Sequence, residues 1–337
     1  MQTYKITWKP LSSLSTPLQS DTIFGHLCWA VKYLWEESSL VDLIAILKQR
    51  PALVLSSAFP DGKLPKPAIP LKTEVLKQLR ANLLKDPELR GLTDLQLNQV
   101  LKELKREAWI DLETLLQNEC LLDLPLQLQK NARSRALDKL GKGGQLKQKT
   151  DNCETMKQSI EFHNKIDRIS GTSSGSGELF ASNTTFFRNL VFSSWLKTDI
   201  YSLEQLQELF KFISLHGFGK DKNTGKGRFE IKVEPYSWPQ CTNFNAYLNL
   251  SNMVPAESDS ILASYTAKTK FAKIGGDYAS SKTPFKYPVF IIEPGAVFFA
   301  GDTRTPPRGM LLRSVHPDPD IVQNLYSFSL PIMVKGS

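Results

Sequence analysis

The residues best suited to chemistry lie in a glycine-rich run at residues 217–229 that combines glycines with basic side chains. The phosphate loop of nucleotide hydrolases is excluded, because five residues instead of four separate Gly219 from the Gly225-Lys226 pair and Gly227 follows it. We interpret the run as a connection from a helix to a strand, in which glycine lets a nucleic-acid backbone approach closely. The alternative is a mobile surface hairpin.

Two of the four histidines offer candidate chemistry. His163 lies beside Asn164 and Arg168, a neighbourhood suited to hydrogen bonds with phosphates or base edges. A second interpretation is a metal-independent endoribonuclease, in which His163 or His26 is the general base and a lysine stabilises the developing charge. His26 lies on the apolar side of an expected helix, where a packed histidine is the simpler reading.

Other catalytic classes have little support. No H-E-x-x-H motif is present, and the four cysteines never form a C-x-x-C pair. Asp318 and Asp320 alternate with Pro317 and Pro319 and are interpreted as a surface turn, so neither a metal site nor a cofactor is expected. Asp21 is interpreted as a helix cap. A Ser-His-Asp triad cannot be assigned without geometry. Binding is therefore favoured over catalysis.

The positive charge is concentrated in three segments. The chain has 42 Lys and Arg against 34 Asp and Glu, a formal net charge of +8. Residues 130–149 hold seven basic residues, Arg133 and Arg135 among them, against one acid, and residues 264–286 hold five lysines against one acid. The third segment is 217–232. Flexible basic segments gain affinity for a phosphate chain by releasing counterions, although solvated surface loops would have the same composition.

The order of expected elements predicts an α+β fold with antiparallel sheets. A strand at 4–8 precedes a helix that begins near Ser20 and Asp21, and a strand at 52–59 follows. After an insertion, the order strand, helix, strand repeats at 179–192, 203–213 and 229–233. This β-α-β, β-α-β order is that of a ferredoxin-like module backed by two helices.

The length of 337 residues predicts two domains. The first covers 1–238, with a helical insertion at about 71–120, broken near Asp86-Pro87, and a basic loop or hairpin at about 123–177. The second, 239–337, is smaller and rich in strands. No apolar run is long enough to cross a bilayer and the first residues do not resemble a signal peptide, so a cytoplasmic protein is expected.

Four stretches in this order resemble a known family: Leu18–Ala30, Leu55–Pro67, Phe162–Arg168 and Gly217–Phe229. They are similar to the fourth Csm subunit of type III-A CRISPR effector complexes, within the RAMP superfamily. The resemblance covers most of residues 1–300 and implies two ferredoxin-like modules and no catalytic role. It also implies a thumb-like hairpin that wedges against RNA, with 123–160 as the expected equivalent.

The resemblance further implies that the chain holds the 5′ handle of the crRNA and joins a large polymerase-like subunit to the backbone RAMP subunit in antiviral defence. The RNA-binding residues expected from the resemblance and the basic segments are Ser20, Arg133, Arg135, His163, Asn164, Arg168, Gly217, Gly219, Lys220, Gly225, Lys226, Gly227 and Arg228. The competing hypotheses are the endoribonuclease above and a protein-interaction scaffold with incidental basic loops.

Overall fold

The computed structural model describes residues 1–113, 121–122, 124–140, 155–164, 169–170, 179–260, 262–301 and 304–334. The chain is α+β and its first sheet is antiparallel, in the order β10-β1-β9-β2. These strands are β1 (Gln2–Pro10), β2 (Leu53–Leu55), β9 (Phe192–Thr198) and β10 (Phe229–Pro235), and β3 (Phe59–Pro60) also pairs with β9. This is the ferredoxin-like strand order, as expected.

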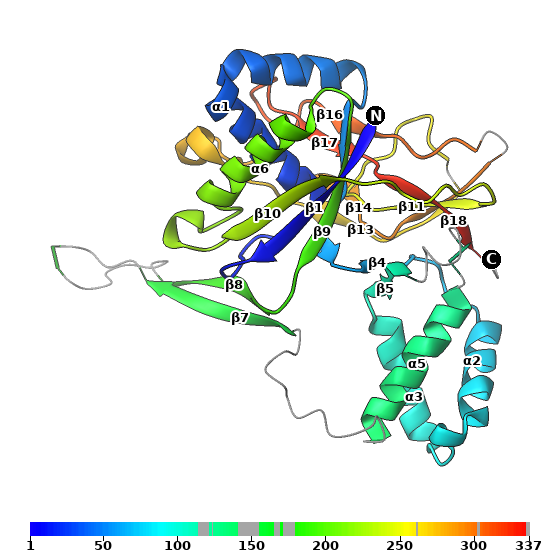
Figure 1. The fold of residues 1–337 in the computed structure, drawn as a ribbon. Coiled ribbons are helices and arrows are strands. Elements are labelled where there is room, and N and C mark those ends of the chain that lie inside the picture. Colours follow the sequence, from blue (N-terminus) through cyan, green and yellow to red (C-terminus); the bar gives the residue numbers. More distant parts are fainter. Residues whose placement is uncertain are drawn as a thin grey trace.

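Helices α1 (Ser20–Gln49) and α6 (Leu203–His216) cover one face of this sheet (Figure 1). Alternate residues of β1, Tyr4, Ile6 and Trp8, are buried, since successive strand residues point to opposite faces. Trp8 packs edge-to-face on Phe210 of α6. Helix α1 is kinked, because Glu36 adopts a positive φ of 72° within it.

A helical unit lies apart from the sheet (Figure 1). It consists of α2 (Thr73–Lys85), the short 3-10 turn η1 (Pro87–Leu89), α3 (Asp94–Arg106) and α5 (Leu124–Leu140), and α5 packs against both α2 and α3. The break at Asp86-Pro87 is confirmed. However, the expected helix ends at Arg106, before β5 (Trp109–Asp111), which pairs with β4 (Lys63–Pro65). Residues 124–140, expected as loop or hairpin, are helical because Leu124, Leu128, Ala132 and Ala136 form a buried stripe.

The second half of the expected basic loop contributes to a hairpin. Strands β7 (Thr155–Asn164) and β8 (Leu179–Arg188) pair antiparallel along their whole length and extend away from the first sheet (Figure 1). A single bridge, Leu14 to Thr185, connects β8 to the segment after β1. The expected thumb equivalent, 123–160, therefore includes α5 and half of β7, while its residues 123 and 141–154 lie outside the described part of the chain.

The C-terminal part contains a second sheet in the order β12-β15-β11-β18-β6. Its strands are β6 (Leu121–Leu122), β11 (Ala246–Asn249), β12 (Ala263–Ser264), β15 (Val297–Phe299) and β18 (Ser329–Val334), and only the β18–β6 pair is parallel among the registers described. Two further antiparallel pairs are β13 (Ala267–Lys270) with β14 (Val289–Ile292) and β16 (Gly309–Leu312) with β17 (Gln323–Tyr326). A 3-10 turn, η3 (Gly276–Ser280), lies between β13 and β14.

The apolar core extends across the expected boundary between the two domains. One cluster joins Trp8, Leu27 and Phe210 to Leu248 and Phe328 of the C-terminal part. The division at residue 238 stays a prediction. No described helix is both long and apolar enough to span a bilayer.

Candidate nucleic-acid interface

The glycine-rich loop (residues 217–228) connects α6 to β10, as the sequence predicts. Helix α6 begins with a capping box formed by Ser202 and Gln205, which satisfies two amides of its first turn. It ends at Gly217, whose φ is 78°, a value that favours glycine. A short 3-10 turn, η2 (Lys222–Thr224), forms the outer bend of the loop.

The backbone of this loop is anchored to the segment that follows β1. The amide of Gly227 donates to the carbonyl of Ser13 at 2.8 Å, and the amide of Arg228 donates to Ser12 Oγ at 2.9 Å. The amide of Lys220 donates to Thr16 Oγ1 at 2.9 Å. These three amides already have acceptors within the protein, so they are not available to a phosphate.

The close packing of the loop explains two of its glycines. A Cβ on Gly227 would lie 1.9 Å from the carbonyl oxygen of Phe218, and one on Gly219 would lie 2.5 Å from Cβ of Thr16. Gly225 differs, because a Cβ there would have no atom within 4 Å. At Gly219 and Gly227 the missing side chain therefore makes room for the chain itself, whereas the sequence suggested room for a nucleic acid.

His26, on helix α1, holds the glycine-rich loop through a hydrogen bond and a ring contact. Its Nε2 accepts a hydrogen bond from the amide of Gly219 at 2.9 Å, and its ring stacks on Phe218 with centroids 4.4 Å apart. Burial, and secondly the charge of Lys222, lowers the pKa of His26 to about 3. The ring is therefore neutral at physiological pH, and its unprotonated Nε2 positions the loop by accepting from the amide of Gly219.

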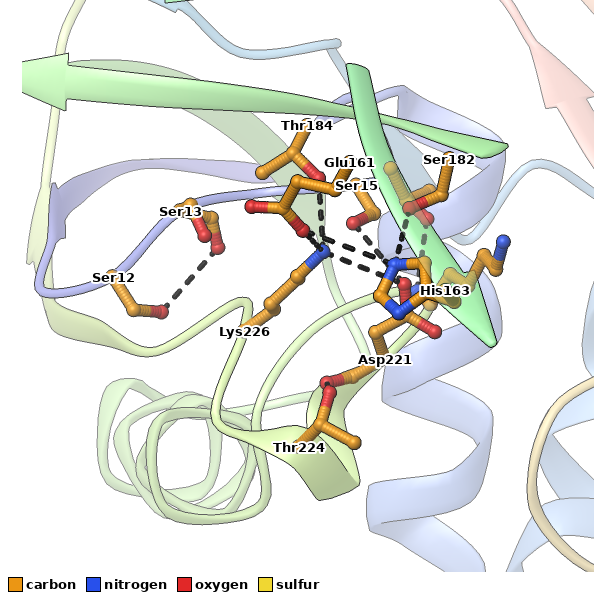
Figure 2. A network of polar contacts seen from close by, with 12 residues as sticks. Ser12, Ser13, Ser15, Glu161, His163, Ser182, Thr184, Asp221, Thr224 and Lys226 are labelled. Atoms are coloured by element: carbon orange, nitrogen blue, oxygen red, sulfur yellow. Dashed lines mark hydrogen bonds and ion pairs between the residues drawn. The ribbon is translucent and has the colours of Figure 1, made fainter. Parts of the chain in front are cut away.

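Lys226 connects the loop to the β7–β8 hairpin (Figure 2). Its side chain is only 11% exposed; Nζ forms an ion pair with Glu161 and donates to Thr184 Oγ1 at 2.8 Å. Asp221 lies 3.8 Å away on the other side. Hydrogen bonding from Lys226, only partly offset by desolvation, lowers the pKa of Glu161. Two carboxylates thus balance the charge of this lysine.

His163 lies next to this network, on β7 and not in a loop (Figure 2). Its Nε2 is 2.9 Å from Ser182 Oγ and 3.9 Å from a carboxylate oxygen of Glu161, while its ring stacks on Phe180. Asn164, at the end of the same strand, is exposed. The structure therefore brings His163 and the glycine-rich loop together, although 54 positions separate His163 from Gly217 in the sequence.

The glycine-rich loop carries three further cations. Lys220 and Arg228 are exposed and Lys222 is half-buried; within the described part of the chain neither lysine has a carboxylate partner. The guanidinium of Arg228 donates to the carbonyl of Leu215 at the end of α6, which orients it. Sequence reasoning did not select Lys222, although it belongs to the same basic run.

The other expected RNA-binding residues lie elsewhere. Arg133 and Arg135 are on α5 in the helical unit; Arg133 contacts Asp86 and Glu88 at 2.6 Å each, and Arg135 lies 3.7 Å from Glu107. These pairs connect α5 to the rest of the helical unit. Arg168 lies outside the described residues.

Asp21 is not a helix cap, contrary to expectation, and neither is its neighbour Ser20. Gln19 occupies the N-cap position of α1 without a side-chain cap bond. The buried Ser20 Oγ accepts from the amide of Asn252 at 3.0 Å, so it faces the C-terminal part instead of its own helix. The physical reason is that these side chains form hydrogen bonds with Asn252, Lys270 and Gln323, three residues from distant segments, instead of with the first amides of α1.

Asp21 is the centre of this buried cluster. Its carboxylate accepts from Lys270 at 2.7 Å, from Asn252 at 2.9 Å and from Gln323 at 2.8 Å. Burial alone would raise the pKa of Asp21, but the charge and hydrogen bond of Lys270, together with the hydrogen bond from Asn252 and the charge of Lys286, outweigh it, so the pKa is lowered. The cluster joins the start of α1 to three segments of the C-terminal part. No group of three metal-ligating side chains occurs among the described residues.

Comparison with known proteins identifies the fold. No protein-family model and no curated protein sequence matches the chain. The crystal structure of a Csm1-Csm4 cassette in complex with AMPPNP contains a similar chain, with a TM-score of 0.55 and 13% identity over 100% of both chains. The crystal structure of a Csm3-Csm4 subcomplex in the type III-A CRISPR-Cas interference complex gives a TM-score of 0.53 and 14% identity, over 98% of this chain and 99% of that one. The chain therefore shares its fold with chains of these two Csm4-containing structures, in agreement with the resemblance of its sequence motifs.

Proposed function

We propose that the chain is a guide-RNA-binding subunit of a type III-A CRISPR interference complex, which grips the 5′ handle of the crRNA without cleaving it. The observation that carries this proposal is the anchored glycine-rich loop, which presents Lys220, Lys222 and Arg228 on a fold similar over its full length to chains in Csm4-containing structures. In such a complex, base pairing between the guide RNA and its target recognises the target sequence, whereas the protein binds the sugar-phosphate backbone and the handle of the guide RNA.

The same similarity supports partners for this chain. We propose that it contacts a large polymerase-like subunit and a backbone RAMP subunit, because the similar structures are of Csm1-Csm4 and Csm3-Csm4 assemblies. Co-expression with the neighbouring genes tests this. The subunits should co-purify and the 5′ end of a small RNA should be protected from nuclease. A chain that elutes alone and without RNA would favour the scaffold hypothesis.

Removing Lys220 and Lys222 from the loop should weaken RNA binding and reduce its salt dependence. For Lys220→Ala with Lys222→Ala, we expect the slope of log K against log salt to fall by about 0.7 for each lost contact with a single-strand phosphate. Binding of handle RNA at several salt concentrations measures this slope.

The matched control is Lys9→Ala with Lys232→Ala. It removes two lysines from exposed ion pairs with Glu230 and Glu234 of β10, so the net charge changes equally. An equal loss of slope in both double variants would show that total charge, and not the loop, governs binding.

One observation supports the endoribonuclease hypothesis: His163, Glu161 and Lys226 lie in one network of polar contacts. The pairing of Lys226 with two carboxylates weighs against it, since its charge is already balanced. We expect repeat RNA to stay intact when incubated with the chain in chelator. Cleavage that His163→Ala abolishes would establish the enzyme instead.

A further inference from the structure

The C-terminal part contains a two-stranded β-ribbon with exposed aromatic side chains. The pairing of β13 with β14 continues past both strands: the amide of Lys286 donates to the carbonyl of Ala272, and the amide of Ile274 donates to the carbonyl of Pro284, each at 2.8 Å. Residues 267–274 and 284–292 therefore form one two-stranded element, named here the aromatic ribbon. Successive residues of each strand point alternately to its two faces. Val289 lies opposite Lys270 and Phe285 lies opposite Lys273, so one extra residue at 287–288 forms a bulge that shifts the alternation by one on that strand.

The inner face of the aromatic ribbon is fixed to the body of the protein. Lys270 reaches Asp21 at 2.7 Å and Gln19 at 2.6 Å, and Lys286 donates to the carbonyl of Val322 at 2.8 Å. Burial lowers the pKa of Lys286 to about 8, in keeping with an inward position. Two of the lysines that make residues 264–286 basic are thus structural, and their positions determine which residues face outward.

The outer face displays three phenylalanines to solvent. Phe271 is 75% exposed, Phe290 is 65% exposed and Phe285 is 63% exposed. Register places Phe290 opposite Thr269, with Phe271 two residues further, and a bridge places Phe285 opposite Lys273. Residues two apart on a strand are separated by about 7 Å. The rings thus follow one another along the ribbon.

The chemistry of this face suits nucleobases. Within the described residues, none of the three rings pairs with another aromatic ring. Lys273 lies over Phe285, 5.8 Å from its centroid, and Lys282 is exposed near the turn of the ribbon. Aromatic rings alternating with cations are the arrangement by which proteins stack bases and neutralise phosphates of a single strand.

We infer that the outer face of the aromatic ribbon binds single-stranded RNA by stacking bases on Phe271, Phe285 and Phe290. This inference rests on the proposed function and adds a second contact surface to the glycine-rich loop. RNA is favoured over a protein partner because the rings alternate with Thr269 and Lys273 instead of forming a continuous apolar patch, and the charge between them is positive.

The test measures binding of a fluorescent short oligoadenylate to the full chain by anisotropy, in the wild-type background and in the Lys220→Ala, Lys222→Ala background. Each of Phe271→Ala, Phe285→Ala and Phe290→Ala should weaken binding about tenfold in both backgrounds, within the range known for base stacking. Phe271→Tyr should keep wild-type affinity, whereas Phe271→Leu should not. Leu262→Ala, a substitution at a residue that is 66% exposed and outside the ribbon, is the control.

Thermal unfolding should be unchanged in these variants, because the rings are exposed. If the wild-type chain binds RNA and the phenylalanine variants bind equally well, the inference fails while the proposed function stands. If those variants bind RNA normally but no longer co-purify with a partner subunit, the ribbon is a protein interface and the inference is overturned. Absence of any RNA binding by the wild-type chain would reject both.

Discussion

Asp21→Asn should lower the free energy of unfolding by about 3–5 kcal/mol, the usual cost of removing one partner of a buried ion pair. The variant leaves the ammonium of Lys270, whose side chain is 13% exposed, without its carboxylate. Asn252 and Gln323 also lose a charged acceptor. Urea unfolding at neutral pH measures the loss.

The same pair should make stability depend on pH. Because the pKa of Asp21 is lowered in the folded chain, its contribution is complete above the unfolded value of about 3.9 and is lost as pH falls through the lower folded value. Asp21→Asn should therefore flatten the acid limb of stability against pH.

Two controls separate the pair from general effects of charge. Adding Lys270→Met to Asp21→Asn should recover much of the loss, since neither buried charge then lacks a partner. Glu230→Gln, which breaks an exposed pair with Lys9, should cost at most about 1 kcal/mol. A loss from Asp21→Asn no larger than that from Glu230→Gln would contradict the role given to the cluster.

Gly227→Ala should disrupt the glycine-rich loop and, with it, handle binding. The added Cβ would lie 1.9 Å from a backbone oxygen, and the φ of 68° is unfavourable for alanine. Positive φ alone costs about 1–2 kcal/mol, and the collision adds to this because backbone atoms must move. We expect a lower melting temperature and at least a tenfold loss of affinity for handle RNA.

Gly225→Ala is the matched substitution. It has a similar backbone requirement, with φ of 92°, but open space around the new methyl group. Gly225→Ala should lower the free energy of unfolding only by the cost of a positive φ, about 1–2 kcal/mol, and should retain most of the affinity for handle RNA. Equal effects at the two positions would mean that packing against Phe218 does not hold the loop.

The first sheet could be predicted from sequence because its signals are local. Alternation at Tyr4, Ile6 and Trp8 and the helical stripe of α6 both reflect burial against one core. Helix α5 could not be predicted and was expected as a loop or hairpin, because a helix rich in basic residues resembles a loop when its small buried residues, Ala132 and Ala136, are not weighted.

The candidate site was only partly predictable. The glycine-rich run and His163 are visible in the sequence, and the structure brings them together through Lys226 and Glu161. The partners of Asp21 could not be found, since Lys270 and Gln323 lie about 250 and 300 positions away and a carboxylate at a helix start is usually a cap. The ribbon phenylalanines do carry a signal, the alternation of Thr269, Phe271 and Lys273, although the lysines of this segment by themselves indicate only charge.

The anchoring of the glycine-rich loop affects the thermodynamics of recognition. Because Ser12, Ser13, Thr16 and His26 already hold its backbone amides, the loop is arranged before a ligand arrives. Association then costs little conformational entropy in this segment, and the ordering penalty falls mainly on the RNA strand.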